Sequence, residues 1–126
     1  MLDEALEGNE TTSIEDFEKL IIDWARDKEI LTKATPLTQI AKTIEEVEET
    51  RDALFAQQNQ LIMYVDSKGR QKETNEEILD GFGDQLVTII IGLEMQGLEM
   101  SQALGQAYNV ISKRTGKMVN GMFVKD

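Results

Sequence analysis

Hydrophobic residues recur at helical spacing along most of this chain, and short polar breaks separate the regular stretches. The first stretch opens at Ser13, where Ser-Ile-Glu-Asp has the form of a capping box. Its apolar face consists of Phe17, Leu20, Ile21 and Trp24. This spacing predicts a helix that ends near Glu29. Residues 1–12 are acidic and show no period, which predicts a frayed lead-in.

A second helix is predicted from Thr35 to about Gln58. Thr35 suits the N-cap, and Pro36 suits the first helical position, where its missing N–H has no partner to lose. The apolar stripe of this helix consists of Leu37, Ile40, Ile44, Val47 and Leu54. A stripe with this spacing is expected to face the core.

A third helix is predicted from Thr74, which leads another capping box, to about Met95. From Leu86 onward this segment is apolar almost all round, a pattern typical of the central and most buried helix. A break at Gly97 separates it from a fourth predicted helix over residues 99–113.

Two segments depart from the helical pattern. Residues 59–73 fit either a prolonged helix or a short strand, with a turn at 66–69. Near the C-terminus, Asn120-Gly121 lies between apolar pairs and predicts a β-hairpin. The whole pattern predicts one all-α domain over residues 1–126, with a short C-terminal β-hairpin.

Composition narrows the chemistry. The chain has no His and no Cys, which excludes Ser-His-Asp triads, His- or Cys-ligated zinc, disulfides and thiol catalysis. Its formal net charge of −11 would repel a nucleic-acid backbone, so no nucleic-acid partner is expected. No signal-peptide pattern is present, and no apolar run approaches the roughly 20 residues that span a bilayer. No membrane partner and a cytoplasmic location are therefore expected.

Carboxylates are the strongest acid–base groups left, and two pairs of them stand at helical spacing. Glu46 and Glu49 share one face of the second predicted helix with Lys42, one turn earlier. Asp80 and Asp84 share a face at the start of the third. Hard carboxylate oxygens suit Mg²⁺ or Mn²⁺. An acidic run is more often solvated surface, however, so the first pair alone indicates little.

Asp84 strengthens the metal interpretation because it heads an apolar segment and is expected to be partly buried. An unpaired, desolvated carboxylate costs several kcal/mol, which either a metal ion or an ion pair with Arg114 would relieve. Glu77 is either a further ligand or, as we favour, part of the capping box. Gly81 and Gly83 indicate the close approach of another helix or of a ligand.

A polar cluster near the C-terminus is mostly cationic. Its members are Asn109, Lys113, Arg114 and Lys117. Cations in this position either complement the dipole at the end of a helix or bind phosphate, and the sequence leaves both open.

These features together resemble the MazG-like family of all-α nucleotide pyrophosphohydrolases. The resemblance rests on residues 45–49, on residues 80–88 and on Asn109 with Lys113-Arg114, and residues 117–125 resemble the tail of small phage-encoded members. The family pattern has Glu three residues before the Asp of the third helix. Here that position is Gly81 and the acidic residue is Asp80; Glu77 with Asp80 is an alternative match one turn earlier.

The resemblance implies a four-helix bundle completed by oligomerisation, as a homodimer or homotetramer, in the cytoplasm (that of the host, for a phage protein). It implies hydrolysis of a nucleoside triphosphate to the monophosphate and pyrophosphate, with Mg²⁺ as cofactor and Mn²⁺ as a substitute. The metal ligands would be Glu46, Glu49, Asp80 and Asp84. The general base would be Glu45 or Glu46. The triphosphate-binding residues would be Lys42, Asn109, Lys113, Arg114 and Lys117.

Trp24 would wall the base pocket, although an aromatic residue on an apolar helix face more often belongs to the core. A purine deoxynucleotide is weakly preferred as substrate. Two other functions stay open: an acidic helical adaptor without catalysis, and a nucleotide-binding regulator.

Overall fold

The computed structural model of the protein describes residues 12–126. This part of the chain is mainly α-helical, with two short antiparallel strand pairs. The helices are α2 (Ile14–Asp27), α3 (Ile30–Lys33), α4 (Pro36–Gln58), α5 (Thr74–Met95) and α6 (Met100–Ile111). The strands are β1 (Met63–Val65), β2 (Gln71–Glu73), β3 (Gly116–Val119) and β4 (Met122–Lys125). The lead-in predicted over residues 1–12 lies, apart from Thr12, outside the described residues.

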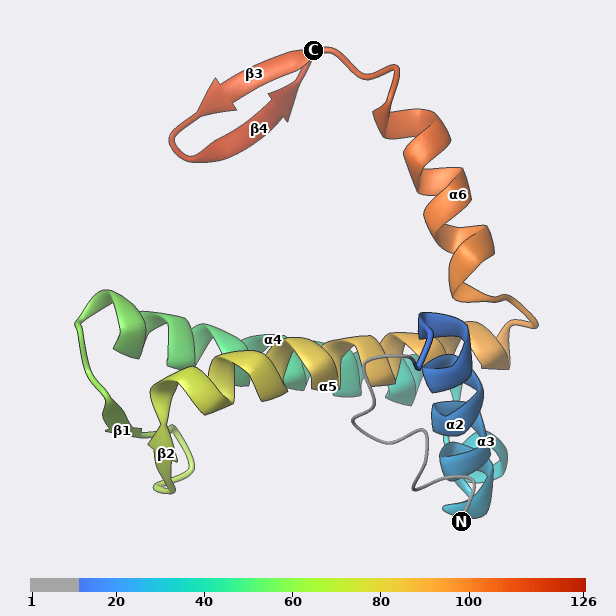
Figure 1. Ribbon diagram of the computed structural model, residues 1–126, viewed down its shortest axis with the longest axis horizontal. Helices are drawn as coiled ribbons and strands as arrows, with labels where there is room; N and C mark the ends of the chain where they lie inside the picture. Colours follow the sequence, from blue (N-terminus) through green and yellow to red (C-terminus); the bar gives the residue numbers. More distant parts are fainter. Residues whose placement is uncertain (1–11) are drawn as a thin grey trace.

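The two longest helices, α4 and α5, lie side by side and antiparallel, and the β1–β2 hairpin joins them at one end (Figure 1). Helix α2 packs against α5 near the other end. Helix α6 and the β3–β4 hairpin, here called the arm, project away from this body (Figure 1). Among the described helices, none is long and apolar enough to cross a membrane.

The predicted helix starts at Ser13 and Thr35 are confirmed. Both residues form capping boxes, the first with Asp16 and the second with Thr38. Helix α2 ends slightly before the expected Glu29, which takes a left-handed backbone with φ of 65° and leads into α3. Residues 59–73 form a β-hairpin, which decides between the two structures that the sequence left open.

The capping box predicted at Thr74 is wrong, and Glu77 has no capping role. The carboxylate of Glu73 caps α5 by accepting the N–H groups of Asn75 and Glu76. The Thr74 hydroxyl instead donates to the carbonyl oxygen of Leu61 at 2.6 Å, which ties the base of the β1–β2 hairpin to the start of α5.

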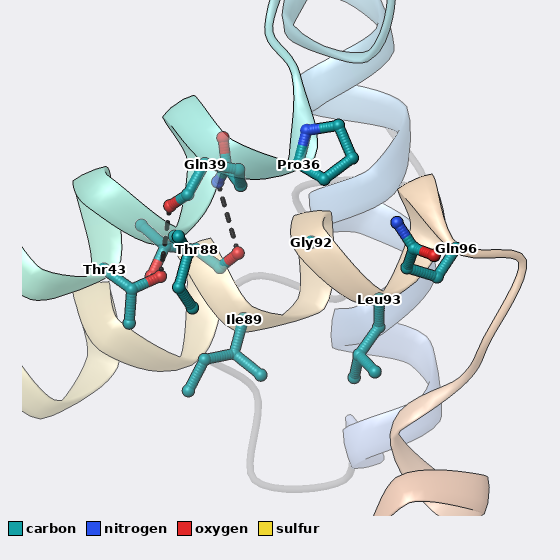
Figure 2. Close-up of a pocket in the computed structure, with 9 residues that line it drawn as sticks. Pro36, Gln39, Thr43, Thr88, Ile89, Gly92, Leu93 and Gln96 are labelled. Carbon is teal, nitrogen blue, oxygen red and sulfur yellow. Dashed lines mark hydrogen bonds between the residues drawn. The ribbon is translucent and has the colours of Figure 1, made fainter.

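Polar and small side chains fill the contact between α4 and α5. Figure 2 shows part of this contact. Gln39 Nε2 donates to the carbonyl oxygen of Thr88 at 3.2 Å, and the Thr43 hydroxyl donates to the Thr88 hydroxyl at 2.8 Å. Further along, Gln85 Nε2 donates to the Thr50 hydroxyl at 2.9 Å. We call these five residues the polar seam. Because its groups satisfy one another, the seam holds the two helices in a fixed register.

The prediction that the apolar stripe of α4 faces the core is wrong for the single chain. Leu37 is 80% exposed, Ile40 54% and Ile44 56%. The stripe lies about a third of a turn away from the polar seam at the helical period. Small and polar residues occupy the seam instead, because they let the two backbones come close.

Helix α5 is also less buried than predicted. Of the apolar run that begins at Leu86, only Ile90 and Ile91 are buried, whereas Leu86 and Ile89 are exposed. Every residue of the arm after Met100 is exposed as well. The described chain therefore leaves apolar surface on α4, on α5 and along the whole arm.

Candidate metal centre

Carboxylates on α4 and α5 are close enough to act on one another electrostatically. Burial raises the pKa of Glu46, and the negative charges of Glu49 and Asp84 raise it further. Partial burial also raises the pKa of Asp84, and the negative charges of Asp80, Glu49 and Glu77 raise it further. Groups on one helix thus act on groups of the other. We call Glu46, Glu49, Asp80 and Asp84 the carboxylate site.

Burial differs between the two carboxylates whose pKa is raised. Asp84 as a whole residue is exposed, and its carboxyl group is only partly buried. The buried carboxylate is Glu46, which is only 8% exposed because it lies on the side of α4 that faces α5. Its ion pair is with Lys42 on the same helix, at 3.5 Å. The alternative pair of Asp84 with Arg114 is not formed, since Arg114 lies beyond α6 on the arm.

Cations surround the α4 side of the site. Lys42 Nζ lies 3.4 Å from Glu45, and Lys68 Nζ lies 3.1 Å from Glu45 and 3.2 Å from Glu49. Arg70 Nη2 lies 3.5 Å from Glu49. The hydrogen bond from Lys68, followed by the charge of Lys42, lowers the pKa of Glu45. Glu45 is therefore an ionised, cation-bound group, whereas its neighbour Glu46 has a raised affinity for protons.

The α5 side of the site has no such neutralisation. Among residues 12–126, neither Asp80 nor Asp84 forms an ion pair. Glu77, one turn before Asp80, pairs with Lys72 at 3.5 Å. This distribution makes Asp80 a more available ligand than Glu77.

A divalent cation fits this donor set. All the ligating atoms would be hard carboxylate oxygens, as Mg²⁺ prefers, and a cation would remove the repulsion that raises the pKa of Glu46 and Asp84. In the described part of the chain, no three carboxylates are arranged to hold a metal ion as they stand. Binding would therefore require the α4 carboxylates to turn away from their present Lys and Arg partners.

Gly81 marks a close approach of α5 to α4. It is buried against α4, where an added Cβ would overlap the Thr50 hydroxyl oxygen. Close helix approach thus accounts for Gly81. Gly83 has open space around it and lines a groove between α2 and α5.

An open pocket adjoins the carboxylate site on the side of α2. Its volume is about 620 Å³, and Trp24 and Asp84 both line it, with Leu20 and Val87 as apolar neighbours. Trp24 is 49% exposed, so it is not a core residue. An aromatic face beside a carboxylate cluster is suited to stack a base whose phosphates reach toward the carboxylates.

The chain does not bring the predicted cations of the arm to its own carboxylates. Asn109 lies on α6, Lys113 and Arg114 follow that helix, and Lys117 lies on β3, all of them exposed. Helix α6 leads away from α4 and α5, and the β3–β4 hairpin lies apart from them (Figure 1).

Comparison with protein-family models, curated proteins and solved structures finds no match for this chain. The MazG-like resemblance accordingly rests on the residues themselves. The structure places the two acidic segments of that resemblance on facing helices.

Sequence reasoning missed Lys68 and Arg70 as site residues. Lys68 is 23 residues from Glu45 along the chain, and only the β1–β2 hairpin brings the two together. The turn signal at 66–69, which contains Lys68 and is followed by Arg70, was the available hint.

Proposed function

We propose that this protein is a Mg²⁺-dependent nucleoside triphosphate pyrophosphohydrolase of the MazG-like type. It would hydrolyse a (d)NTP to the monophosphate and pyrophosphate, with a weak preference for purine deoxynucleotides. The observation that carries the proposal is that Glu46 of α4 and Asp84 of α5 lie close enough for the charge of Asp84 to raise the pKa of Glu46, beside an open pocket that Trp24 and Asp84 line. Perturbed carboxylates beside an open pocket are a common mark of a functional site.

When bound, Mg²⁺ would supply the Lewis acidity that polarises the triphosphate and lowers the pKa of a water molecule. Glu46, Glu49, Asp80 and Asp84 would hold it. Of the two candidate bases, Glu46 fits the role better, because its pKa is raised whereas that of Glu45 is lowered. A base with raised pKa takes a proton from water more readily at neutral pH. Lys42 would stay beside the phosphates, and the exposed face of Trp24 would support the base.

We further propose that the active form is a homo-oligomer, either a dimer or a tetramer, in which helices of several copies complete a bundle. The exposed stripe of α4 supports this, since contiguous apolar surface of this kind is uncommon on monomers. The arm supports it too, because all its apolar residues after Met100 are exposed. Its cations Lys113, Arg114 and Lys117 complement the carboxylates, so a second copy could supply them to the site.

Two measurements test the proposal. Thermal melting during Mg²⁺ titration should show a rise in melting temperature that Asp84→Asn and Glu46→Gln remove. Glu48→Gln is the matched control, since Glu48 is an exposed acidic residue of the same helix that forms no ion pair among the described residues. Incubation with each of the common NTPs and dNTPs should release pyrophosphate from at least one.

The outcomes separate the competing functions. A melting shift with metal and nucleotide but no pyrophosphate would favour the nucleotide-binding regulator. The absence of any shift and of any pyrophosphate would favour the acidic adaptor and would refute the enzyme.

A further inference from the structure

We propose that Lys68 and Arg70, here called the hairpin cations, bind the triphosphate of the substrate and exchange between the carboxylates of α4 and the substrate phosphates. This inference rests on the proposed function, because it concerns the same site. It assigns a role to the β1–β2 hairpin, which the proposed mechanism does not otherwise use.

The tip of the hairpin is built to present these two side chains. Asp66, whose side chain is 7% exposed, accepts the backbone N–H groups of Lys68 at 2.9 Å and of Arg70 at 2.8 Å. Its second oxygen accepts Arg70 Nε at 2.9 Å. Gly69 closes the turn with φ of 79°. The Asp66 carboxylate therefore fixes the backbone that carries both cations and orients the Arg70 guanidinium.

The side chains of Lys68 and Arg70 form ion pairs with carboxylates of α4. Lys68 contacts Glu45 and Glu49, and Arg70 contacts Glu49, all within 3.5 Å. The side chains of Lys68 and Arg70 are nevertheless 52% and 50% exposed, so both keep one side free toward solvent. Surface ion pairs of this kind are weak and exchange readily.

Metal binding and these ion pairs compete for Glu49. A divalent ion bound there would take the oxygen that Lys68 and Arg70 now contact and would repel both cations. A triphosphate bound at that metal would bring its negative oxygens to the same place. The hairpin cations can then pass from carboxylate to phosphate with a small side-chain movement, because the Asp66 turn keeps their backbone in position.

The two side chains suit phosphate in different ways. Asp66 holds the Nε of Arg70, which leaves the terminal nitrogens to form paired hydrogen bonds with phosphate oxygens. Lys68 is a compact charge on a flexible stem that can follow an oxygen as it moves. In a chain with a net charge of −11, such local cations are needed to bring an anionic substrate to an acidic site.

The test measures two ligands whose affinities should move in opposite directions. Calorimetry with Mn²⁺ alone should show that Lys68→Ala and Arg70→Ala bind the metal several-fold more tightly, since a competing cation is gone. Calorimetry with Mg²⁺ and a non-hydrolysable dNTP analogue should show binding weakened about tenfold or more by each substitution. Lys68→Arg should retain most of the analogue affinity.

Lys33→Ala is the matched control for charge, because Lys33 is an exposed lysine paired with Glu29 in α3, away from the hairpin. It should leave both affinities unchanged. In turnover assays, the hairpin variants should raise KM for the nucleotide far more than they lower kcat.

Four results would overturn the inference. Tighter Mn²⁺ binding with unchanged analogue affinity would reduce Lys68 and Arg70 to simple counter-ions. Weaker binding of both ligands together with a lower melting temperature would make them structural. A wild-type protein that binds neither Mn²⁺ nor the analogue and releases no pyrophosphate would refute the proposed function itself, whereas an active wild type with unchanged variants would refute this inference alone.

Discussion

Substituting Gly81 with alanine tests whether the close approach of α4 and α5 sets up the carboxylate site. Gly81 lies between Asp80 and Asp84 on α5 and packs directly on Thr50 of α4. An added Cβ would overlap the Thr50 hydroxyl oxygen and would lie 3.1 Å and 3.2 Å from the Thr50 Cβ and Cγ2 atoms. Either the helices move apart or Thr50 changes its rotamer.

Thr50 has little freedom to move. Its hydroxyl donates to the carbonyl oxygen of Glu46 at 2.8 Å and accepts from Gln85 Nε2 at 2.9 Å. Overpacking in a close contact costs about 1–3 kcal/mol, and losing a neutral hydrogen bond costs about 0.5–1.5 kcal/mol. Alanine regains about 1 kcal/mol in helix propensity over glycine. The free energy of unfolding should therefore fall by about 0.5–3.5 kcal/mol.

Gly92→Ala is the matched control, because Gly92 also lies on the α4-facing side of α5. Its added Cβ would meet only Gln39 Cγ at an ordinary 3.8 Å, so this variant should be unchanged or more stable by up to about 1 kcal/mol. Urea unfolding at one protein concentration, with and without Mg²⁺, measures both variants. Adding Thr50→Ala to Gly81→Ala should return part of the lost stability, and the double-mutant cycle gives the coupling.

The result that would refute this reasoning is a Gly81→Ala variant as stable as Gly92→Ala. A destabilised Gly81→Ala that kept the full Mg²⁺-induced rise in melting temperature would separate the helix approach from the metal site. It would show that the spacing of the carboxylates does not depend on this contact.

Three further expectations follow from the geometry. The pKa values of Glu46 and Asp84 are raised, so these two groups bind protons more tightly in the folded protein than in the unfolded chain. The melting temperature in EDTA should therefore rise as the pH falls from 7 toward the ordinary carboxyl range. Glu46→Gln should make this dependence on pH weaker. Trp24 is the single tryptophan, so its fluorescence should change when Mg²⁺ and a nucleotide analogue bind, and Trp24→Leu should raise KM; unchanged fluorescence would place the base elsewhere. Ile44→Glu should yield smaller particles in light scattering, whereas an unaltered mass would exclude the α4 stripe from the proposed assembly.

Local sequence signals located most of the secondary structure. The caps at Ser13 and Thr35 depend on side chains that act within one turn, so their pattern is visible in the sequence. The Asn-Gly turn is equally local: Asn120 and Gly121 take φ of 51° and 80°, the left-handed backbone that such a hairpin turn needs.

The sequence could not show which faces meet. Apolar periodicity marks the most hydrophobic side of α4, but the side that packs on α5 is small and polar and lies elsewhere on the helix. The capping box predicted at Thr74 is wrong for a similar reason. The Thr74 hydroxyl donates to the carbonyl oxygen of Leu61, which lies on the other side of the hairpin. Side-chain pairs within one helix were predictable from spacing, whereas the contact of Lys68 with α4 depends on a strand pairing that the pattern left open.

The polar seam and the exposed apolar faces have a joint consequence for how the site is stabilised. Hydrogen bonds such as those of Thr50 and Thr88 fix the register of α4 and α5 but add little net free energy, since the same groups bond to water when unfolded. Repulsion between the carboxylates of the site also destabilises the contact between α4 and α5. Under the proposed assembly, a large apolar contribution would come from the outer faces of α4 and α5 and from the arm, which a single chain leaves exposed. Under the proposed function, metal and assembly would stabilise the same pair of helices, so each should strengthen the other.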